Sequence, residues 1–563
     1  MNRTYLRYCL TFLMLAAFYQ ALQSQELVAG AAGERIQVCT DRTMYVSGEK
    51  VLFSVIVYHA KDSLAAELSH AFYCELITPG GNTITGRKYL LQNAAGQGCL
   101  AIPDETVSGV YYLKFYTRFM RNAGTDTYTF IRLKIINPYK TEVMSGSDAA
   151  DTTTIAGNSM TTQPAGRALE IINGNRPFRP REEIHLAIRE NPLQALNSRI
   201  CLSIVPESTY ETSFIQSGST GIREKSAWYL PETRGISISG QLIDKDAGKP
   251  VQDAKINLSI IGDRDILVVR TDTSGRFFFP LPGYHGKKDI FLCSDDLPGI
   301  KPEILIDNDF CSRQVKLPSP PFKLNETEKK AAYNLLVNSR VTSLFRDDTI
   351  SGNTTVEENH TSFYGLPSEI LVIEKYIDLP TLSEYFTELP GILKLRKVQG
   401  KRQFRFFTDQ PEMSLYDPLI LVDWVAVNDI EKILGMPPSE IERIELVNAP
   451  YVKGNITYGG IISFISRKND FASIDLPTSG TFVNYRFLEQ CADVIQASPA
   501  AGNIPDSRNT VYWNPAVQLT GEGTADVSFQ APDTPGRYTI LLRRMTRSGQ
   551  VLLTEETIVV KDK

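Results

Sequence analysis

The sequence predicts a mainly β protein made of tandem antiparallel β-sandwiches and one small α+β domain. Short runs in which apolar and polar residues alternate, such as 51–57 and 110–116, recur along the chain with turn residues between them. The chain has 563 residues, of which 42% are hydrophobic and 10% aromatic, so it is too long for one domain and apolar enough for several cores. One segment, 325–345, carries a long helical pattern.

The N-terminus has the pattern of a secretory signal peptide. Arg3 and Arg7 precede an apolar run over 8–22, and small or polar residues follow at 23–25. The alternative is an uncleaved anchor, but fifteen apolar residues are short for a membrane span, which needs about 20. We therefore expect residues 1–24 to be a signal peptide. The mature chain is then expected in the periplasm or in association with the outer membrane.

The first domain is predicted as a β-sandwich over 30–138. It shows the alternating runs described above, and turn signals such as 79–82 separate them. The segment 139–165 is rich in Ser, Thr, Gly and Ala and has no periodicity, so it is predicted to be a flexible linker.

An internal repeat predicts a second sandwich that is split along the chain. The pattern Tyr45-x-x-x-Glu49 returns as Phe178-x-x-x-Glu182, whereas Gly109-x-Tyr111 returns only near the C-terminus, as Gly536-x-Tyr538. We infer that 166–232 begins the second sandwich and that 480–563 completes it. The alternative is two separate small sandwiches.

The predicted insertion contains three parts. Residues 235–317 have the pattern of a compact seven-stranded sandwich, 318–365 hold the helix and a linker, and 366–470 form an α+β block. Aspartates cluster at 244, 246, 263, 265 and 272, but the spacing of a calcium loop is missing. We interpret them as turn-capping residues.

The cysteines indicate neither zinc nor a complete set of disulfides. Seven cysteines remain after the signal peptide, an odd number, and none forms a C-x-x-C pair. Cys74 alternates in phase with apolar neighbours and is predicted to be buried on a strand. A disulfide between Cys293 and Cys311 could join neighbouring strands, and the sequence does not decide whether it forms.

No catalytic constellation is found in the sequence. The five histidines are scattered, and the motifs of serine hydrolases, zinc proteases, Walker loops and dinucleotide-binding folds are absent. We therefore expect no enzyme activity, no catalytic residue, no cofactor and no metal. The net charge of −5 gives no reason to expect nucleic acid as a partner.

One local run of positive charge is a candidate interaction surface. Six basic residues and no acid lie between 391 and 405: Lys394, Arg396, Lys397, Lys401, Arg402 and Arg405. This run could meet phosphate groups or an acidic partner. The alternative is a solvated hairpin whose apolar residues Ile392, Leu393, Leu395 and Phe404 face inward.

Residues 366–470 resemble the plug domain of TonB-dependent outer-membrane receptors. The resemblance rests on a buried strand that ends at Asp423, on the run with Ile441, Glu442, Ile444 and Glu445, and on Tyr458-Gly459-Gly460 before the last strand. The proline at 438 is predicted to start a short helix that carries the Glu/Arg run. Trp424 departs from the family pattern, which usually has glycine there.

The neighbouring modules resemble two further families. Residues 235–317 look like the carboxypeptidase regulatory-like (transthyretin-like) domain, and the two sandwiches look like macroglobulin-type (MG2-like) domains. A TonB-dependent receptor has a barrel of roughly 22 strands after its plug, yet only 95 residues follow position 468 here. We therefore expect that this chain does not itself form a transport channel.

The resemblance implies a non-enzymatic, exported envelope protein that acts as a modular binding scaffold at the outer membrane. The expected partner is an outer-membrane or periplasmic protein, and the ligand is unknown. One alternative is an uptake accessory whose plug docks into a separately encoded barrel. Another is a macroglobulin-like, protease-interacting protein without a thioester, with 141–164 as its bait loop.

Overall fold

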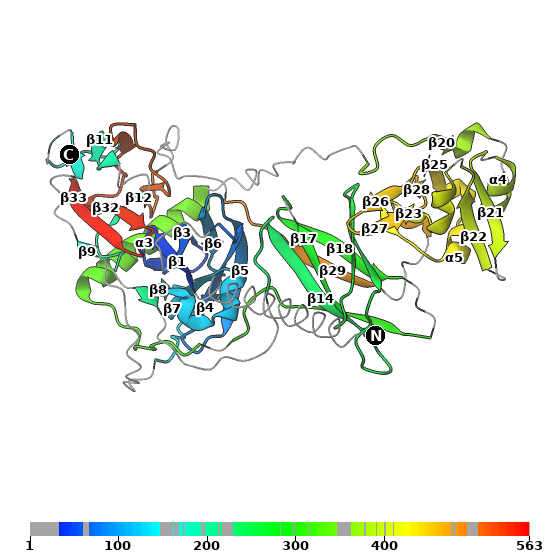
Figure 1. The fold of residues 1–563 in the computed structure, drawn as a ribbon. Helices are drawn as coiled ribbons and strands as arrows, with labels where there is room; N and C mark the ends of the chain where they lie inside the picture. The colour runs from blue at the N-terminus through cyan, green and yellow to red at the C-terminus, as the bar shows by residue number, and fades with distance from the viewer. Residues whose placement is uncertain are drawn as a thin grey trace, which may run out of the picture. The chain divides into compact units, whose positions relative to one another are not determined.

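The computed structural model describes most of the chain, which folds as two compact units. The described residues are 33–59, 67–146, 161–162, 168–172, 174, 176–192, 198–211, 214–216, 229–281, 283–295, 297, 299–313, 315–345, 362–376, 379–389, 391–398, 401–408, 410–473, 476, 480–491 and 505–561. The first unit comprises Met1–Ile236, Phe310–Ile350 and Leu488–Lys563, and the second comprises Ser237–Asp309 and Ser351–Phe487. Strands arranged in many separate sheets dominate both, so the protein is mainly β (Figure 1). The predicted signal peptide lies outside the described residues.

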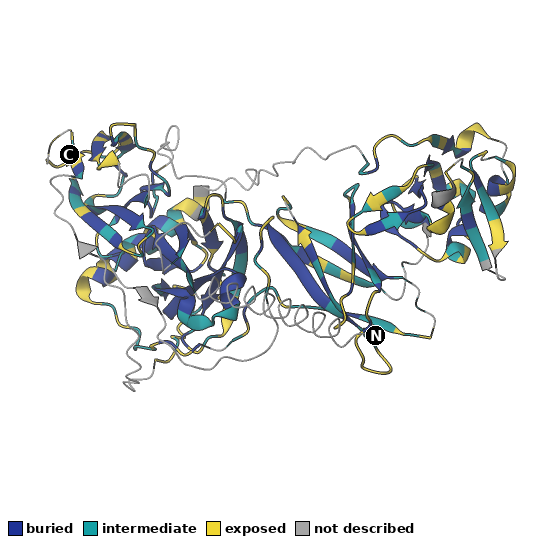
Figure 2. Cartoon of the chain, viewed as in Figure 1, coloured by how far each residue is buried: buried dark blue, intermediate teal, exposed yellow. Residues whose placement is uncertain are grey.

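The first sandwich of the first unit packs two sheets around an aromatic core. One sheet has the order β1-β3-β6, and the other has the order β13-β8-β7-β4-β5 with β2 paired to β8. Phe53 lies edge-on to Phe72, Tyr89 and Phe115 between the sheets, and most strand residues are buried (Figure 2). The strands are β1 (Glu34–Thr40), β2 (Met44–Val46), β3 (Lys50–His59), β4 (Ala71–Ile77), β5 (Thr83–Leu90), β6 (Ala95–Ala101), β7 (Gly109–Tyr116), β8 (Thr129–Ile136) and β13 (Phe214–Gln216).

The second sandwich is assembled from segments that are distant in the sequence. Its sheets have the orders β10-β11-β31 and β30-β12-β32-β33-β9. Ile184 and Ile540 lie in one hydrophobic core, so the segments near 184 and 540 complete a single sandwich. The strands are β9 (Thr161–Thr162), β10 (Leu169–Ile171), β11 (Glu183–Arg189), β12 (Ser198–Pro206), β30 (Tyr512–Asn514), β31 (Thr524–Gln530), β32 (Gly536–Thr546) and β33 (Val551–Val560).

The two sandwiches share the same turn devices, which explains the sequence repeat. Glu49 accepts a hydrogen bond from the Val46 N–H at 2.6 Å, and Glu182 accepts one from the Arg179 N–H at 2.8 Å. The glutamate therefore closes the turn before the strand in each copy. In each copy a tyrosine also donates to the carbonyl four residues earlier: Tyr111 to Val107 at 2.9 Å, and Tyr538 to Thr534 at 2.7 Å. This contact resembles the tyrosine corner of immunoglobulin-like sandwiches.

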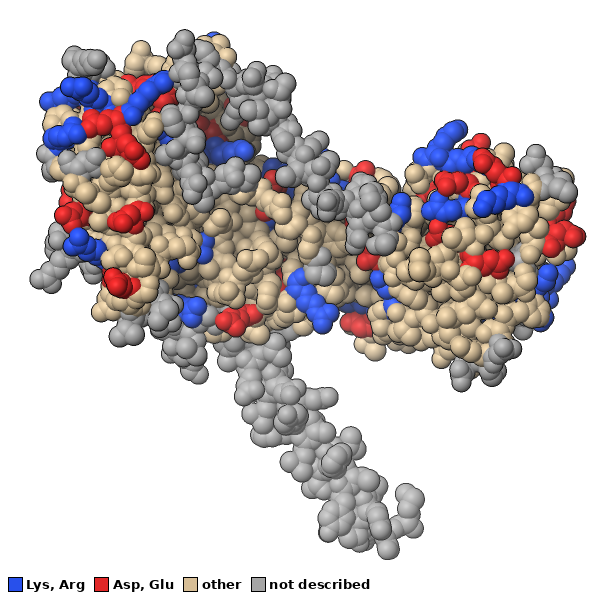
Figure 3. Space-filling model, turned by 90° about the horizontal axis from the view of Figure 1, so that it is seen from above, with Lys and Arg blue, Asp and Glu red and all other residues tan. Residues whose placement is uncertain are grey.

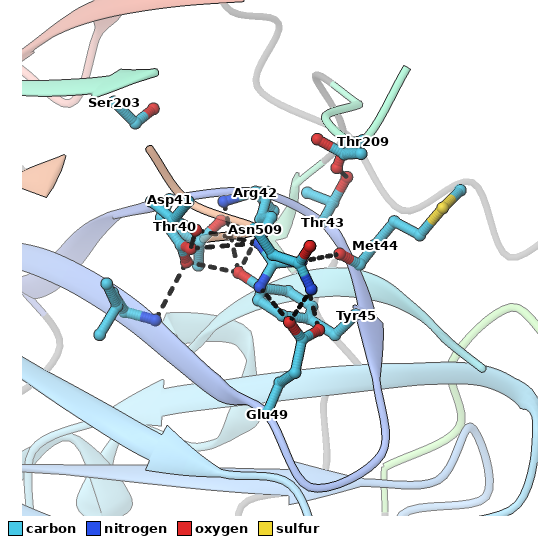
Figure 4. Close-up of polar contacts among 12 residues, drawn as sticks. Thr40, Asp41, Arg42, Thr43, Met44, Tyr45, Glu49, Ser203, Thr209 and Asn509 are labelled. Carbon is cyan, nitrogen blue, oxygen red and sulfur yellow. Dashed lines mark hydrogen bonds and ion pairs between the residues drawn. The ribbon is translucent and has the colours of Figure 1, made fainter. Parts of the chain in front are cut away.

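A buried polar network joins the two sandwiches of the first unit. Arg42, Glu49 and Asn509 point toward one another in Figure 4. Arg42 Nη2 lies 2.9 Å from Glu49 Oε1, and Asn509 Nδ2 donates to the same oxygen at 2.6 Å. On the other side, Asp41 accepts hydrogen bonds from Tyr45 at 2.6 Å and from Thr510 at 2.5 Å. Every buried charge in this network therefore has a partner, as burial requires.

The predicted helix at 325–345 is confirmed as α3 (Glu326–Phe345), but it belongs to the first unit and not to the insertion that was expected to contain it. Ala332 and Leu335 pack against Met44, Val46 and Ile136 of the first sandwich. Glu328 in its first turn forms an ion pair with Lys134 of β8. The predicted end of the small sandwich at 317 is also wrong, because Cys311, Val315 and Leu317 lie in the core of the first sandwich.

The small sandwich of the second unit has seven strands, but one of them comes from beyond the predicted domain. Its sheets have the orders β17-β14-β19 and β16-β15-β18-β29. β29 pairs with β18 along 481–486, so the predicted start of the C-terminal segment at 480 is wrong by several residues. The strands are β14 (Ile236–Asp244), β15 (Lys255–Ile260), β16 (Ile266–Arg270), β17 (Arg276–Leu281), β18 (Lys287–Ser294), β19 (Pro302–Ile306) and β29 (Thr481–Arg486).

The α+β module of the second unit is built on one mixed five-stranded sheet. The strand order is β20-β25-β28-β23-β24, with β23 parallel to β28. Two hairpins and two short helices complete the module. The elements are β20 (Glu369–Val372), α4 (Leu382–Glu388), β21 (Leu393–Val398), β22 (Lys401–Phe406), β23 (Leu419–Val422), β24 (Val425–Ala426), α5 (Ile430–Leu434), β25 (Ile441–Val447), β26 (Tyr451–Lys453), β27 (Ile456–Tyr458) and β28 (Ile461–Ser466). Short 3-10 helices lie at Phe119–Asn122, Thr125–Thr127, Ile373–Lys375, Pro411–Leu415, Pro438–Glu440 and Phe471–Ser473.

One disulfide, Cys99–Cys491, connects β6 of the first sandwich to the segment where the chain returns to the first unit. The bridge between Cys293 and Cys311 does not form, because the two thiols are buried in different cores. Cys74 is buried on β4, as its alternation predicted. Among the residues that the structure describes, no helix is long and apolar enough to cross a membrane.

Candidate interaction surface

Asp423, the first residue of the plug motif, is a structural acceptor inside the module. Asp423 and Trp424 form the two-residue turn between β23 and β24, and both adopt positive φ angles, 45° and 63°. The Asp423 carboxylate accepts hydrogen bonds from the N–H and the hydroxyl of Ser466 at 2.8 and 2.6 Å. It also accepts the Phe471 N–H at 2.9 Å. The residue therefore fastens the end of β28 to the β23–β24 turn.

Trp424 occupies a position whose backbone favours glycine. Its indole is 8% exposed and packs in a hydrophobic core with Val425 and Ile461. The Arg264 guanidinium lies 5.0 Å from the ring centroid. Packing therefore compensates for the positive φ angle, and this explains how the chain departs from the usual glycine.

Replacement of Asp423 by alanine is expected to destabilise the second unit by about 1–3 kcal/mol, because two buried donors and one half-buried donor lose a charged acceptor. Urea unfolding followed by tryptophan fluorescence measures this effect. The control is Glu442→Ala in the same motif, where the side chain is exposed and pairs with Arg443 on the same strand. It is expected to change the free energy of unfolding by less than about 0.5 kcal/mol. Equal effects of the two substitutions would contradict the role of Asp423.

The Glu/Arg run lies on a strand, which corrects the predicted helix. Only Pro438–Glu440 is helical, and Ile441–Val447 forms β25. The side chains of Ile441 and Ile444 are buried in the module core. Glu445 faces the other side of the sheet, where it accepts a hydrogen bond from Tyr364 at 2.7 Å and pairs with Arg443 at 2.7 Å. Burial and the hydrogen bond to Glu445 raise the pKa of Tyr364.

The Tyr458-Gly459-Gly460 turn allows a close approach of backbones. A Cβ on Gly459 would overlap the carbonyl oxygens of Met413 and Tyr416, and one on Gly460 would overlap the Phe406 ring. Gly460 also has a φ angle of 101°. Tyr458 is buried, and Lys255 Nζ lies 5.6 Å from its ring centroid. Burial, together with the charge of Asp295, raises the pKa of Tyr458. The motif therefore shapes the module and offers no exposed group for chemistry.

The basic residues form the hairpin of β21 and β22, and several of them have acidic or aromatic neighbours. Arg402 forms a two-point ion pair with Glu431, whose pKa this contact lowers, and Arg405 lies 3.3 Å from Asp417. The Arg396 guanidinium lies 5.0 Å from the centroid of the Phe407 ring. In the face shown in Figure 3, Lys and Arg side chains of this module lie among Asp and Glu side chains.

The remaining cations of the hairpin differ in exposure. Lys397 is exposed, whereas Lys394 is half-buried and donates to the Thr387 carbonyl at 3.4 Å. The side chain of Lys401 lies outside the described residues. Leu393 and Phe404 face the core, and Ile392 and Leu395 pack against it. The hairpin therefore has an apolar inner face, and Arg396 and Lys397 near its tip stay exposed.

Sequence reasoning missed an apolar patch at the sheet edge beside this hairpin. Leu366 is 94% exposed, Ile370 is 49% exposed and Phe407 is 45% exposed. Asn448 contacts both segments, because its N–H donates to Ser368 Oγ at 3.0 Å and its side chain donates to the Phe407 carbonyl at 3.2 Å. We call Leu366, Ile370 and Phe407 the edge patch. No sequence signal marks it, since its residues come from separate segments.

The aspartates of the small sandwich act in its turns. Asp272 accepts hydrogen bonds from the N–H groups of Ser274 and Arg276 at 2.8 and 2.9 Å. Asp244 accepts one from Asp246, Asp263 pairs with Lys288, and Asp265 pairs with Lys453. Within the described ranges, no group of three or more His, Cys, Asp or Glu side chains could hold a metal ion.

Comparisons with known proteins found only distant structural similarity. No family model matches the chain, and no curated protein matches it. Among solved structures, Escherichia coli alpha-2-macroglobulin activated by porcine elastase has 10% identity and a TM-score of 0.24 over 94% of this chain. Salmonella alpha-2-macroglobulin reacted with methylamine has 8% identity and a TM-score of 0.24, also over 94%. The chain spans 44% and 40% of those two proteins. Red sea bream transglutaminase has 9% identity and a TM-score of 0.12 over 46% of this chain and 29% of its own. At these TM-scores the similarity assigns neither a fold family nor a function.

Proposed function

We propose that this protein is a non-enzymatic, exported component of the cell envelope whose plug-like module binds a protein partner at the outer membrane. The observation that carries the proposal is the edge patch on β20. β20 is the terminal strand of its sheet, and apolar side chains at and beside it are exposed. Natural sheets protect such edges with charges, prolines or bulges, because an open edge invites pairing with another chain. An exposed apolar edge is therefore best explained by a partner that covers it.

The charged residues beside the edge patch indicate what kind of segment it can bind. Arg396 lies over Phe407, and Lys397 is exposed on the same hairpin, so positive charge borders the apolar surface. A complementary ligand is an extended segment with apolar side chains flanked by acidic ones, which can add a strand to β20. We propose that an outer-membrane or periplasmic protein supplies this segment.

The family resemblances support the proposed location. Residues 366–470 resemble a receptor plug, 235–317 resemble the domain that often precedes such plugs, and the sandwiches resemble macroglobulin-type modules. The N-terminal pattern of a signal peptide agrees with export. The disulfide Cys99–Cys491 is suited to an oxidising compartment.

Photocrosslinking in the native envelope tests the proposal. A photoreactive phenylalanine analogue replaces Leu366, and the control carries it at Leu344, a 72% exposed leucine on α3 of the first unit. We expect fractionation and mass spectrometry to identify an outer-membrane or periplasmic protein that is attached at 366 and not at 344. Phe407→Glu is expected to reduce the adduct about tenfold or more, because it places a charge in the apolar contact.

The identity of the adduct separates the proposed function from its alternatives. An adduct with a β-barrel protein would favour a plug that docks into a separately encoded barrel. The proposal would be contradicted if no adduct formed at 366, or if the adducts at 366 and 344 were equal. The macroglobulin-like alternative needs cleavage in its bait loop, and most of 141–164 lies outside the described residues.

A further inference from the structure

The first unit contains a cavity between its two sandwiches. Its volume is about 420 Å³, within the range of pockets that hold small molecules. The first sandwich contributes β3 and the turn between β5 and β6. The second contributes the start of β12, the segment 516–521 and the turn between β32 and β33. Ile56, Ile200, Val517 and Leu519 give the cavity apolar walls.

Two arginines give the cavity a positive charge that the protein does not balance. Arg199 Nε donates to Ser54 Oγ at 2.6 Å and to the Pro515 carbonyl at 3.1 Å, and its Nη2 donates to Gln97 at 3.0 Å. All three acceptors are neutral, and Nη1 has no hydrogen-bond partner among the described residues. Burial lowers the pKa of Arg199, so its charged form lacks full compensation.

Arg547 is the second cation of the cavity, and within the described part of the chain it forms no ion pair and its guanidinium makes no hydrogen bond. It lies in the turn between β32 and β33 and is half-buried. None of the described residues that line the cavity is acidic. A half-enclosed site with two guanidinium groups and no carboxylate attracts an anion, and guanidinium groups match carboxylates in a two-point geometry.

We propose that this cavity binds the carboxylate of a small ligand with a short apolar body, held by Arg199 and Arg547. The carboxylate meets the two guanidinium groups, and the apolar body lies against Ile56, Ile200 and Leu519. A peptide C-terminus and a short fatty acid share this chemistry. The cavity volume limits the ligand to a few residues or a short chain. This site lies in the first unit and does not depend on the function proposed for the edge patch.

Isothermal titration calorimetry on the full chain at low salt tests the site with three probes. The probes are N-acetyl-alanyl-leucine with a free carboxylate, the same dipeptide as its amide, and octanoate. We expect at least one of the acids to bind and the amide to bind about tenfold more weakly or not at all, because it lacks the charge. Binding of the dipeptide acid alone assigns a peptide terminus, and binding of octanoate alone assigns a fatty acid.

Substitutions of cavity residues test whether the acid binds in this cavity. Arg547→Gln is expected to weaken the affinity for the acid about tenfold or more, because it removes the charge. Arg547→Lys keeps the charge but loses the two-point geometry, so it is expected to weaken the affinity less than Arg547→Gln does. Ala516→Leu narrows the cavity and is expected to abolish binding. The control is Arg179→Gln, which removes an exposed cation of the same sandwich and is expected to leave affinity unchanged. Thermal unfolding verifies that each variant is folded. The proposal is overturned if neither acid binds at millimolar concentration, if acid and amide bind alike, or if Arg547→Gln binds as tightly as the unmodified chain.

Discussion

Replacing Glu75 with leucine is expected to destabilise the first unit by about 3–5 kcal/mol, because it leaves the Lys114 ammonium buried without a counter-charge. Lys114 Nζ lies 2.7 Å from Glu75 Oε1, and both side chains are buried. Tyr116 and Thr83 also donate hydrogen bonds to the Glu75 carboxylate, at 2.6 and 2.7 Å. Among the described residues, Lys114 also donates to the Cys311 carbonyl at 3.1 Å, an acceptor without charge. Chemical denaturation of the full chain measures the loss.

Two further variants separate the buried charge from the loss of contacts. The double variant Glu75→Leu with Lys114→Met removes both charges and is expected to recover much of the lost stability, since apolar replacement of a buried pair is often tolerated. Glu105→Leu breaks the exposed pair with Lys140, whose atoms lie 2.6 Å apart, and is expected to leave the free energy of unfolding nearly unchanged. If the double variant is no more stable than Glu75→Leu, the uncompensated charge is not the cause.

Removing the disulfide by the double substitution Cys99→Ser and Cys491→Ser is expected to cost the first unit about 2–5 kcal/mol. The bridge closes a loop across 392 positions of sequence, and constraint of the unfolded chain grows with loop length. Thermal unfolding with and without a thiol reductant measures the effect. Reductant should lower the Tm of the unmodified chain toward that of the double variant.

The free cysteines provide the control for this experiment. Cys311 is buried and unbridged, so Cys311→Ala changes packing without affecting any disulfide. That variant is expected to keep the same reductant-dependent shift in Tm as the unmodified chain. The predicted stabilisation by the disulfide is contradicted if reductant leaves the Tm of the unmodified chain unchanged.

Sequence reasoning was strongest where a side chain closes a local turn. The motifs with Glu49 and Glu182, and those with Tyr111 and Tyr538, each make their key contact within four residues. Because such contacts are local, they leave a fixed spacing in the sequence. This spacing led to a split second sandwich, and the structure pairs β12 with β32.

The errors arose where long-range packing decides the fold. The strand at 481–486 has an alternating pattern that fits either neighbouring domain, and only its pairing with β18 assigns it. The sequence predicts the helix α3 correctly, but its apolar stripe does not reveal that the first sandwich covers it. The run after Pro438 contains charged residues that suggested a helix, yet a pleated strand buries Ile444 and Leu446 on one face.

The same long-range packing limits how much of the candidate site the sequence can predict. The basic run from 394 to 405 is local and was found, but its neutralising partners Glu431 and Asp417 lie elsewhere in the chain. The edge patch and the cavity both combine residues from separate segments, so neither leaves a motif. The roles of Asp423, Gly459 and Gly460 as structural residues became clear only from their contacts.

The split second sandwich also sets the order of events on the ribosome. β12 ends at Pro206, and its partner β32 begins at Gly536, about 330 residues later. At roughly 5–20 residues per second, synthesis of that stretch takes on the order of tens of seconds. The unpaired edge of β12 and its apolar residues stay open to aggregation during this time. We therefore expect β12 to be more prone to aggregate before synthesis is complete than the strands of the first sandwich, whose partners lie close to them in the sequence.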